Sequence, residues 1–259
     1  MNVFLTGASS GIGAALAARY AARGVQLGLF ARRKDALAAV AAQFGPVQPA
    51  IYVGDVRDAS ALRDAARDFV SRFGVPDIVI ANAGISVGTL TLHPEDNEVA
   101  RAILETNVLG MLHTFQPFLP AMIAARHGAL VGIASVAGFR GLPGAEAYCA
   151  SKAAAISYLE SLRVELAGTG VSVVTICPGY VATPMTARNP YPMPFLLRPD
   201  TAARLIVHAI DRRQRFYVLP RRMAWLGRLF RGLPRPLYDS VFARAKHKPR
   251  AGATKTEPR

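Results

Sequence analysis

The sequence is poor in metal-ligating and disulfide-forming residues, since only Cys149 and Cys177 occur among its 259 residues. The spacing of the two cysteines matches no metal-ligand pattern, so we expect two buried thiols in a reducing compartment rather than a disulfide. The five histidines are scattered along the chain, which leaves a metal site without support. Zinc-dependent and disulfide-stabilised classes of protein are therefore disfavoured.

Long apolar runs are also missing. No stretch reaches the ~18 residues that a membrane-spanning helix needs. No basic region followed by an apolar stretch and a cleavage site stands at the start, where residues 2–6 already have the composition of a strand. We therefore expect a cytoplasmic protein, with any membrane contact confined to peripheral binding at the inner face.

Acidic residues are scarce toward the C-terminus. Residues 212–259 contain 14 Lys and Arg but 2 Asp and Glu, so this segment holds a net charge of +12 out of the total of +14. The basicity says little about residues 1–211. Because neither a recognition helix nor an aromatic and basic sheet accompanies it, we expect no nucleic-acid partner.

Short apolar runs rich in β-formers alternate with alanine-rich helical stretches, as in right-handed βαβ units. The predicted strands are 2–6, 26–30, 48–53, 77–81, 129–134, 171–177 and 215–218. The predicted helices are 11–23, 33–44, 58–73, 95–125, 147–167 and 199–210. Pro117 and Pro120 are expected to divide the 95–125 stretch in two. The fold class is thus α/β: a doubly wound parallel sheet of about seven strands with helices on both faces, the Rossmann fold.

A glycine-rich turn joins the first strand to the first helix and reads Thr6-Gly-Ala-Ser-Ser-Gly-Ile-Gly13. Glycine permits a tight turn and lets the backbone approach a pyrophosphate, whose charge suits the N–H groups and dipole of a helix N-terminus. Such a turn alone is weak evidence, but within a βαβ unit it favours a dinucleotide site. The residues assigned to this loop are Gly7, Ser9, Ser10, Gly11, Ile12 and Gly13.

Two arginines follow the second strand. Arg32 and Arg33 stand where a site that prefers NAD has an acidic residue for the ribose 2′-hydroxyl. Guanidinium groups match the 2′-phosphate of NADP(H) by charge-assisted, often bidentate hydrogen bonds. The alternative, a solvated helix start, is disfavoured because positive charge is unfavourable at a helix N-terminus. We therefore predict NADP(H) as the cofactor.

Two more strands end in polar loops. Asp55 and Val56 follow the third strand, and Asn82, Ala83 and Gly84 follow the fourth. Ligands bind at the carboxyl ends of the strands in open α/β sheets. Both loops are therefore expected to contact the cofactor.

Candidate proton-transfer groups follow the fifth strand. Ser135 lies just past it, and Tyr148 and Lys152 are four residues apart near a helix start, so they share one helix face. A tyrosine with an ordinary pKa of about 10 is a poor acid–base catalyst at neutral pH, and a nearby ammonium shifts it toward the phenolate. Ser135 can then hold a substrate oxygen while Tyr148 gives or takes its proton. Taken alone, such a Tyr-xxx-Lys pair is usually only a surface pair.

Together these elements resemble the short-chain dehydrogenase/reductase family. The matching motifs, in the family's order and spacing, are Thr6-Gly-xxx-Gly-x-Gly13, Asn82-Ala-Gly84, Asn107, Ser135, Tyr148-xxx-Lys152 and Pro178-Gly179. The match spans about residues 1–218, and the joint occurrence is highly specific. Ala134 and Ala81 depart from the family's usual serine and asparagine, but neither change removes a reactive group.

The resemblance implies a role for each matched residue. Tyr148 would be the general acid/base, Lys152 would bind the nicotinamide ribose and lower the Tyr148 pKa, and Ser135 would orient the carbonyl. Asn107 would hold a water in a proton relay ending at Lys152, a role compatible with its bonding a neighbouring backbone. Asp55 would contact the adenine. Contacts near the nicotinamide carboxamide are implied for Pro178, Gly179, Val181 and Thr183.

We divide the chain into a single Rossmann-type domain over 1–219, an amphipathic extension over 220–245 and a disordered basic tail over 246–259. The extension gathers its apolar residues on one side of a short helix: Trp225, Leu226, Leu229 and Phe230. Such a segment suits contact with an anionic membrane or a lid over the active site. The alternative is a helix pair packed on the body or on a second subunit.

The sequence therefore predicts an NADP(H)-dependent oxidoreductase that moves a hydride between the nicotinamide and a carbonyl or alcohol carbon of a small molecule. The stretches 86–97, 136–146 and 184–200 would line the substrate pocket, and their Leu, Phe, Pro and Met content favours an apolar substrate. We expect a homodimer or a homotetramer. Two other classes stay open: a non-catalytic NADP(H)-binding sensor, which an intact Ser-Tyr-Lys set disfavours, and a membrane-surface scaffold.

Overall fold

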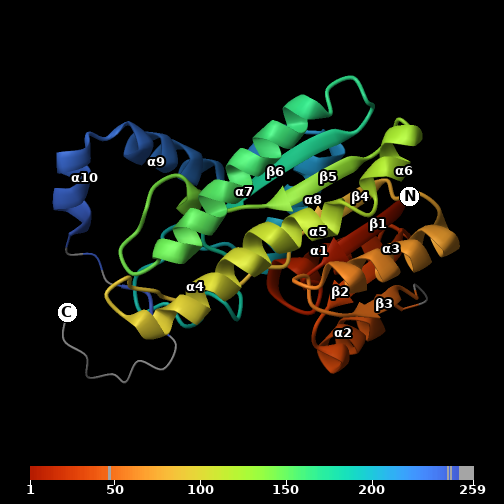
Figure 1. Ribbon diagram of the computed structural model, residues 1–259, viewed down its shortest axis with the longest axis horizontal. Helices are drawn as coiled ribbons and strands as arrows, with labels where there is room; N and C mark the ends of the chain where they lie inside the picture. Colours follow the sequence, from red (N-terminus) through yellow and green to blue (C-terminus); the bar gives the residue numbers. More distant parts are fainter. Residues whose placement is uncertain (46–47, 244, 246, 251–259) are drawn as a thin grey trace.

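The computed structural model describes residues 1–45, 48–243, 245 and 247–250 (Figure 1). Its centre is a seven-stranded sheet in the order β3-β2-β1-β4-β5-β6-β7, with every neighbouring pair parallel. The strands are β1 (Asn2–Thr6), β2 (Gln26–Ala31), β3 (Ala50–Val53), β4 (Ile78–Ala81), β5 (Ala129–Ile133), β6 (Ser172–Pro178) and β7 (Phe216–Leu219). All seven predicted strands are present, and the doubly wound parallel sheet is confirmed.

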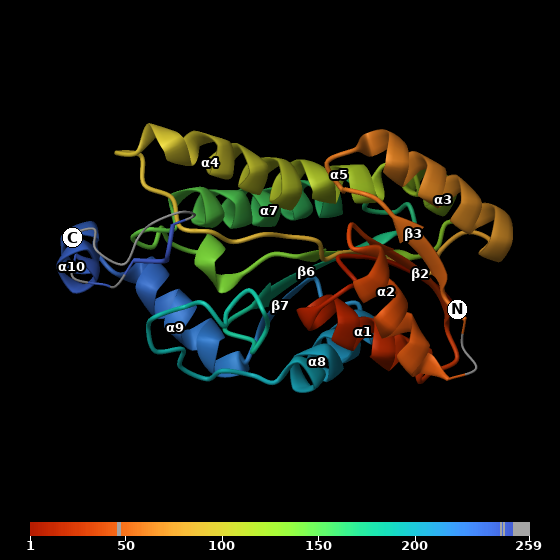
Figure 2. The same ribbon diagram turned by 90° about the horizontal axis from the view of Figure 1, so that it is seen from below.

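Helices cover both faces of the sheet, as Figure 2 shows. One layer consists of α1 (Gly11–Ala21), α2 (Lys34–Ala41) and α8 (Pro199–Asp211). The other consists of α3 (Ala59–Phe73), α4 (Asn97–Leu104), α5 (Gly110–Phe115), α6 (Leu119–Ala124) and α7 (Glu146–Glu165). Because both faces are buried, the central strands are continuously apolar instead of alternating, and every residue of β4 and β5 is buried.

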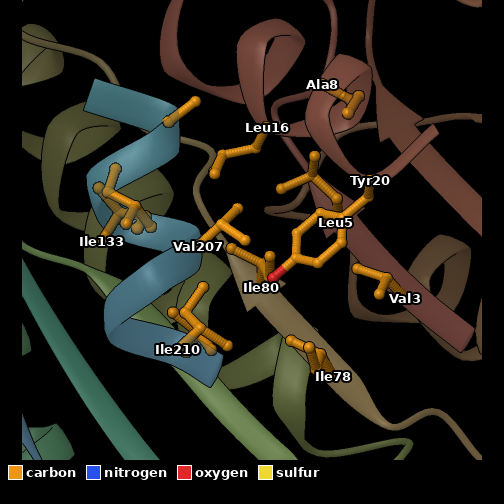
Figure 3. Close-up of a cluster of buried hydrophobic side chains, with 14 of the residues drawn as sticks. Val3, Leu5, Ala8, Leu16, Tyr20, Ile78, Ile80, Ile133, Val207 and Ile210 are labelled. Atoms are coloured by element: carbon orange, nitrogen blue, oxygen red, sulfur yellow. The ribbon is translucent and has the colours of Figure 1, made fainter. Parts of the chain in front are cut away.

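The core is divided by the sheet into two apolar clusters. One joins α1 and α8 to the sheet and contains Tyr20, Ile80 and Val207 (Figure 3). The other is aromatic, with Phe4 within 4.8 Å of Phe118 and 5.5 Å of Phe69 between ring centroids. These clusters fix the sheet rigidly beneath the loops at its carboxyl edge.

The predicted interruption of the 95–125 stretch is confirmed, since α5 ends at Phe115 and α6 begins at Leu119. The structure adds a feature that the sequence does not predict, a π-helical turn over Glu105–Leu109 between α4 and α5. Such turns insert one extra residue per turn and occur often at functional sites. This one carries Asn107.

Two helices, α9 (Arg221–Gly232) and α10 (Arg235–Phe242), lie together at the carboxyl end of the sheet, beyond α7 (Figure 1). They meet the 136–146 loop: Arg140 donates hydrogen bonds to the carbonyls of Phe230 and Leu233, and its guanidinium stacks 4.0 Å from the Tyr238 ring centroid. Of the tail expected to be disordered over 246–259, residues 246 and 251–259 lie outside the described part of the chain. The described residues 247–250 pack against the body of the domain.

Candidate active site

The principal cleft lies where the strand order reverses between β1 and β4, because the connections leaving these two strands turn to opposite faces of the sheet. It encloses about 330 Å³, within the range of small-ligand sites. All the predicted site residues except Asn107 line it. They are Gly7, Ser9, Ser10, Gly11, Ile12, Gly13, Arg32, Arg33, Asp55, Val56, Asn82, Ala83, Gly84, Ser135, Tyr148, Lys152, Pro178, Gly179, Val181 and Thr183.

The loop after β1 needs glycine at two positions for different reasons. Gly7 has a φ of +67°, which disfavours any side chain, and a Cβ there would lie 2.7 Å from the Ala83 Cα. A Cβ on Gly13 would lie 2.1 Å from the Gly7 carbonyl oxygen. The absence of side chains thus brings the first turn of α1 against the loop and leaves its N–H groups facing the cleft.

Hydrogen bonds hold this loop to the end of β4. Thr6 Oγ1 accepts from the backbone N–H groups of Asn82 and Ala83 at 3.2 and 3.3 Å. The Asn82 amide donates to the carbonyls of Thr6 and Gly7 at 3.0 and 3.2 Å. The Asn82 side chain therefore positions the glycine loop, while its backbone faces the cleft.

The far end of the cleft is basic. Arg32 Nη1 lies 3.7 Å from Asp55 Oδ2, and Arg33 reaches Ser9 Oγ at 3.4 Å. Burial favours the neutral form of Asp55, but hydrogen bonds from Arg57 outweigh it and hold the pKa of Asp55 below its ordinary value. Arg32 remains 60 % exposed, so both guanidiniums at this rim have room to meet a phosphate.

Tyr148 lies at the opposite end of the cleft with Ser135. Burial raises the pKa of Tyr148 to about 12, and a hydrogen bond with Ser135 opposes that rise. The sequence analysis considered the charge of Lys152, which would lower this pKa, but not the desolvation of the phenol, which raises it. Tyr148 is therefore protonated at neutral pH and is poised as a proton donor.

Lys152 is only 5 % exposed and donates a hydrogen bond to the Ile133 carbonyl at 2.9 Å. Its Nζ lies 5.9 Å from the centroid of the Tyr148 ring. Burial lowers the pKa of Lys152 to about 8. The ammonium thus sits beside the tyrosine in a desolvated position, where partners in the cleft would stabilise its charge.

Asn107 lies behind the cleft rather than in its lining. Its Oδ1 accepts from the Ile85 N–H at 2.8 Å, and its Nδ2 donates to the Ile85 carbonyl and to Ser151 Oγ at 3.0 and 2.9 Å. Ser151 Oγ in turn donates to the Tyr148 carbonyl. Asn107 therefore connects the π-helical turn to α7 and to the loop after β4. Its bonds to the Ile85 backbone are of the kind that the sequence analysis considered for this residue.

Several cleft residues were missed by the sequence analysis. They are Ala31, Gly54, Ile85, Thr106, Ile133 and Ala134. Four of them lie at strand ends, since Ala31 and Ile133 end β2 and β5, and Gly54 and Ala134 follow β3 and β5 directly. The ends of the predicted strands were therefore the signal that could have found these four. Pro184, Met185 and Thr186 also line the cleft and begin the 184–200 stretch that the sequence analysis expected at the substrate pocket.

No group of three or more His, Cys, Asp and Glu in the described residues is arranged to hold a metal ion. No helix in the same part of the chain is long and apolar enough to cross a membrane. The site instead combines a protonated phenol, a serine hydroxyl and a buried ammonium with a glycine loop at a helix N-terminus. This combination can transfer a proton to an oxygen next to a bound dinucleotide.

Comparison with known proteins gives matching results. A family model described as short chain dehydrogenase matches residues 1–192. An uncharacterized oxidoreductase of Myxococcus xanthus is 41 % identical over 247 residues, covering 95 % of this chain and 97 % of that protein.

Two solved structures show the same fold. The alcohol dehydrogenase of Thermococcus sibiricus, complexed with 5-hydroxy-NADP, aligns with a TM-score of 0.76 at 26 % identity over 84 % of this chain and 95 % of its own. A short chain dehydrogenase/reductase of Burkholderia phymatum, complexed with NAD, aligns with a TM-score of 0.81 at 24 % identity over 96 % of each chain.

Proposed function

Since the chain belongs to the short-chain dehydrogenase/reductase family and is an oxidoreductase, we propose that it reduces a carbonyl group of a small, largely apolar molecule with NADPH, or oxidises the matching alcohol. The single observation that carries this proposal is the cleft in which Tyr148, Ser135 and Lys152 meet the glycine loop. A non-catalytic sensor has no need of a desolvated phenol and ammonium in one pocket, so the enzyme is the better supported function.

The residues of the cleft fit a nicotinamide dinucleotide. NADPH supplies the hydride when it is bound. The N–H groups at the start of α1 suit the pyrophosphate, because they are unpaired helix-terminal donors at a positive dipole end. Lys152 suits the nicotinamide ribose, and the segment Pro178–Thr183 closes the same end of the cleft.

The chain's own groups would handle the proton. Ser135 Oγ and the Tyr148 hydroxyl are both directed to one oxygen of the substrate, which polarises the carbonyl and orients it. Tyr148 gives its proton to that oxygen in the reductive direction and takes it back in the oxidative direction. Burial keeps Tyr148 protonated, which is the form that the reductive direction uses.

The choice of NADP(H) depends on this chain's own residues, because the solved relatives hold either an NADP derivative or NAD. Arg32 and Arg33 support it: two guanidiniums stand at the rim where the 2′-phosphate would lie, and Arg32 is largely exposed. Asp55, the acidic residue nearby, is already bonded to Arg57.

The first test is Tyr148→Phe, which keeps the ring and removes the transferable proton. We expect kcat for NADPH-dependent reduction of a ketone or aldehyde panel to fall by about 10²-fold or more, with an unchanged NADPH Kd. A variant that turns over at the wild-type rate would disprove the role of Tyr148. Loss of NADPH binding would mean that the ring serves the cofactor site instead.

We further propose that residues 220–245 form a distinct extension that contacts an anionic membrane peripherally. Its support is the exposure of apolar side chains on both helices: Trp225 is 73 %, Leu229 60 %, Leu237 51 % and Val241 56 % exposed. Arg221, Arg222 and Arg235 are exposed on the same helices, a combination that suits an interfacial segment.

A further inference from the structure

Residues 247–250 lie against the loop that follows β4, and Lys248 reaches the ring of Tyr148. The Gly88 N–H donates to the Pro249 carbonyl at 2.9 Å, and Gly88 and Arg250 form a parallel bridge. A Cβ at Gly88 would lie 2.3 Å from the Lys248 carbonyl oxygen. The absence of a side chain at Gly88 therefore allows the C-terminal segment to pack directly on this loop.

Arg250 anchors the segment. Its Nε lies 2.8 Å from Asp96 Oδ2, and its Nη2 lies 2.8 Å from Glu95 Oε1. The side chains of Arg250 and Asp96 are only 8 % and 5 % exposed. A buried ion pair stays stable only when each charge keeps its partner, because an unpaired buried charge is strongly destabilising. The segment therefore has one defined position on the 86–97 loop.

That anchor places Lys248 over the catalytic tyrosine. Lys248 Nζ lies 5.3 Å from the centroid of the Tyr148 ring and donates to Ser86 Oγ at 2.6 Å. Its side chain is half-buried, and it pairs with no carboxylate in the described part of the chain. Burial lowers the pKa of Lys248. Arg250, two residues further along the chain, forms ion pairs with two carboxylates. Among the described residues of this segment, Lys248 therefore differs from Arg250 in having no carboxylate partner.

An ammonium that is partly desolvated without a counter-ion is unfavourable unless a ligand supplies the charge. We propose that Lys248 binds the carboxylate of the substrate, so that the substrate is an oxo acid whose keto oxygen meets Tyr148. This inference rests on the proposed reductase function and names its substrate class. The carboxylate is not transformed: the keto carbon gains the hydride, the keto oxygen gains the Tyr148 proton, and a hydroxy acid leaves.

The surroundings favour a single carboxylate with an apolar body. Two other cations nearby have different roles: Arg140 bonds two carbonyls and stacks on Tyr238, and Lys152 is assigned to the nicotinamide ribose. One ammonium matches one unit of negative charge, whereas phosphate sites usually recruit arginine forks. Ile85 and Met185 line the adjoining cleft and suit a hydrocarbon chain.

The kinetic test compares straight-chain 2-, 3- and 4-oxo acids with their methyl esters, which differ in the charge but keep the keto group. The wild type is expected to prefer one acid over its ester in kcat/KM by at least about tenfold. Lys248→Gln, which retains a hydrogen bond to Ser86, should lose about tenfold on the acid and less than about twofold on the ester. Lys248→Arg should recover most of the acid preference. Arg67→Gln, an exposed change of equal charge on α3, should resemble wild type.

A binding test separates this proposal from the reductase function. Tyr148→Phe saturated with NADPH is titrated with the same acids and esters, and the NADPH fluorescence is followed, so turnover is not needed. Lys248→Gln in the Tyr148→Phe background should bind the acid about tenfold more weakly. Acid binding that depends on Lys248 without turnover in the wild type would leave the carboxylate site standing and remove the reductase proposal. Equal binding or turnover of acids and esters, or an acid preference that survives Lys248→Gln, would overturn the assignment.

Discussion

At the scale of single residues, the site depends on groups whose charge the fold makes unfavourable. Tyr148 and Lys152 are both buried, and burial moves their pKa values in opposite directions, to about 12 and about 8. Each group is thereby biased toward its neutral form. Because only a ligand in the cleft can stabilise the charged forms, such residues reduce the stability of the protein without ligand.

Lys152→Met should therefore stabilise the fold near neutral pH. The fall of the Lys152 pKa from 10.5 to about 8 corresponds to a destabilisation of the folded wild type by about 3 kcal/mol. The variant is free of this penalty but loses the hydrogen bond to the Ile133 carbonyl, which is worth about 1 kcal/mol. Urea unfolding should show a gain of about 2 kcal/mol at pH 7.

The same change predicts a pH dependence. Below pH 8 Lys152 of the wild type is protonated in the folded and in the unfolded state, so the full desolvation penalty applies. Between pH 8 and 10.5 the folded state releases its proton first, and the wild type gains stability relative to the variant. The difference between the two proteins should thus shrink from pH 7 to pH 9.5. A constant difference would show that Lys152 is not desolvated.

The proposed preference for NADP(H) also depends on single residues. Replacing both Arg32 and Arg33 by alanine removes the charge-assisted contact proposed for the 2′-phosphate, which is worth about 1.5–3 kcal/mol. We expect the NADPH Kd to rise by about one to two decades and the NADH Kd to stay nearly unchanged, measured by fluorescence titration. Arg67→Ala serves as the charge control. Equal weakening of both cofactors would show that the arginines merely hold the loop.

At the scale of elements, α1 is both the floor of the dinucleotide cleft and the wall of the core. Its N-terminus faces the cleft, and its buried side packs on α8 and the sheet (Figure 3). Tyr20 is fully buried there, and its hydroxyl has no hydrogen-bond partner in the described part of the chain. Burial raises the pKa of Tyr20 far above its ordinary value.

Tyr20→Phe should therefore increase the free energy of unfolding, by about 1 kcal/mol, because an unpaired buried hydroxyl is exchanged for hydrocarbon of the same shape. Tyr52→Phe is the matched control. Its hydroxyl donates to Asp68 at 2.7 Å, so removing it should leave stability unchanged or reduce it. Denaturant unfolding of the three proteins measures both effects. A destabilised Tyr20→Phe protein would mean that the hydroxyl is bonded in solution.

At the scale of the whole molecule, the carboxyl end of the sheet is closed by segments from far along the chain. The loop that holds Arg140, the helices α9 and α10, and residues 247–250 meet there. Removing everything after Pro220 would therefore disturb the substrate pocket as well as any membrane contact. Point variants on the exposed face separate the two roles.

The membrane proposal predicts reversible binding to anionic vesicles. Each basic residue near such a surface contributes about 1 kcal/mol, screened by salt. Trp225 is the one tryptophan in the sequence, so its emission should shift to the blue with phosphatidylglycerol vesicles at low salt and not with phosphatidylcholine vesicles. Leu229→Ser with Leu237→Ser should abolish the shift and keep turnover. Full-length protein that stays unbound at low salt would remove the membrane proposal.

The sequence by itself determined the fold and most of the residues that line the cleft. Strands buried on both faces are continuous apolar runs, and a glycine-rich turn within a βαβ unit favours a dinucleotide site, so the local pattern carried this information. Ser135, Tyr148 and Lys152 were proposed because they occur together with the other motifs of the family, and the structure places all three in the lining of one cleft. Only the tertiary structure decided that burial raises the pKa of Tyr148, because the burial of a side chain depends on all of its neighbours. It also decided the place of Lys248, because contact between residues about 100 positions apart leaves no local periodicity to detect.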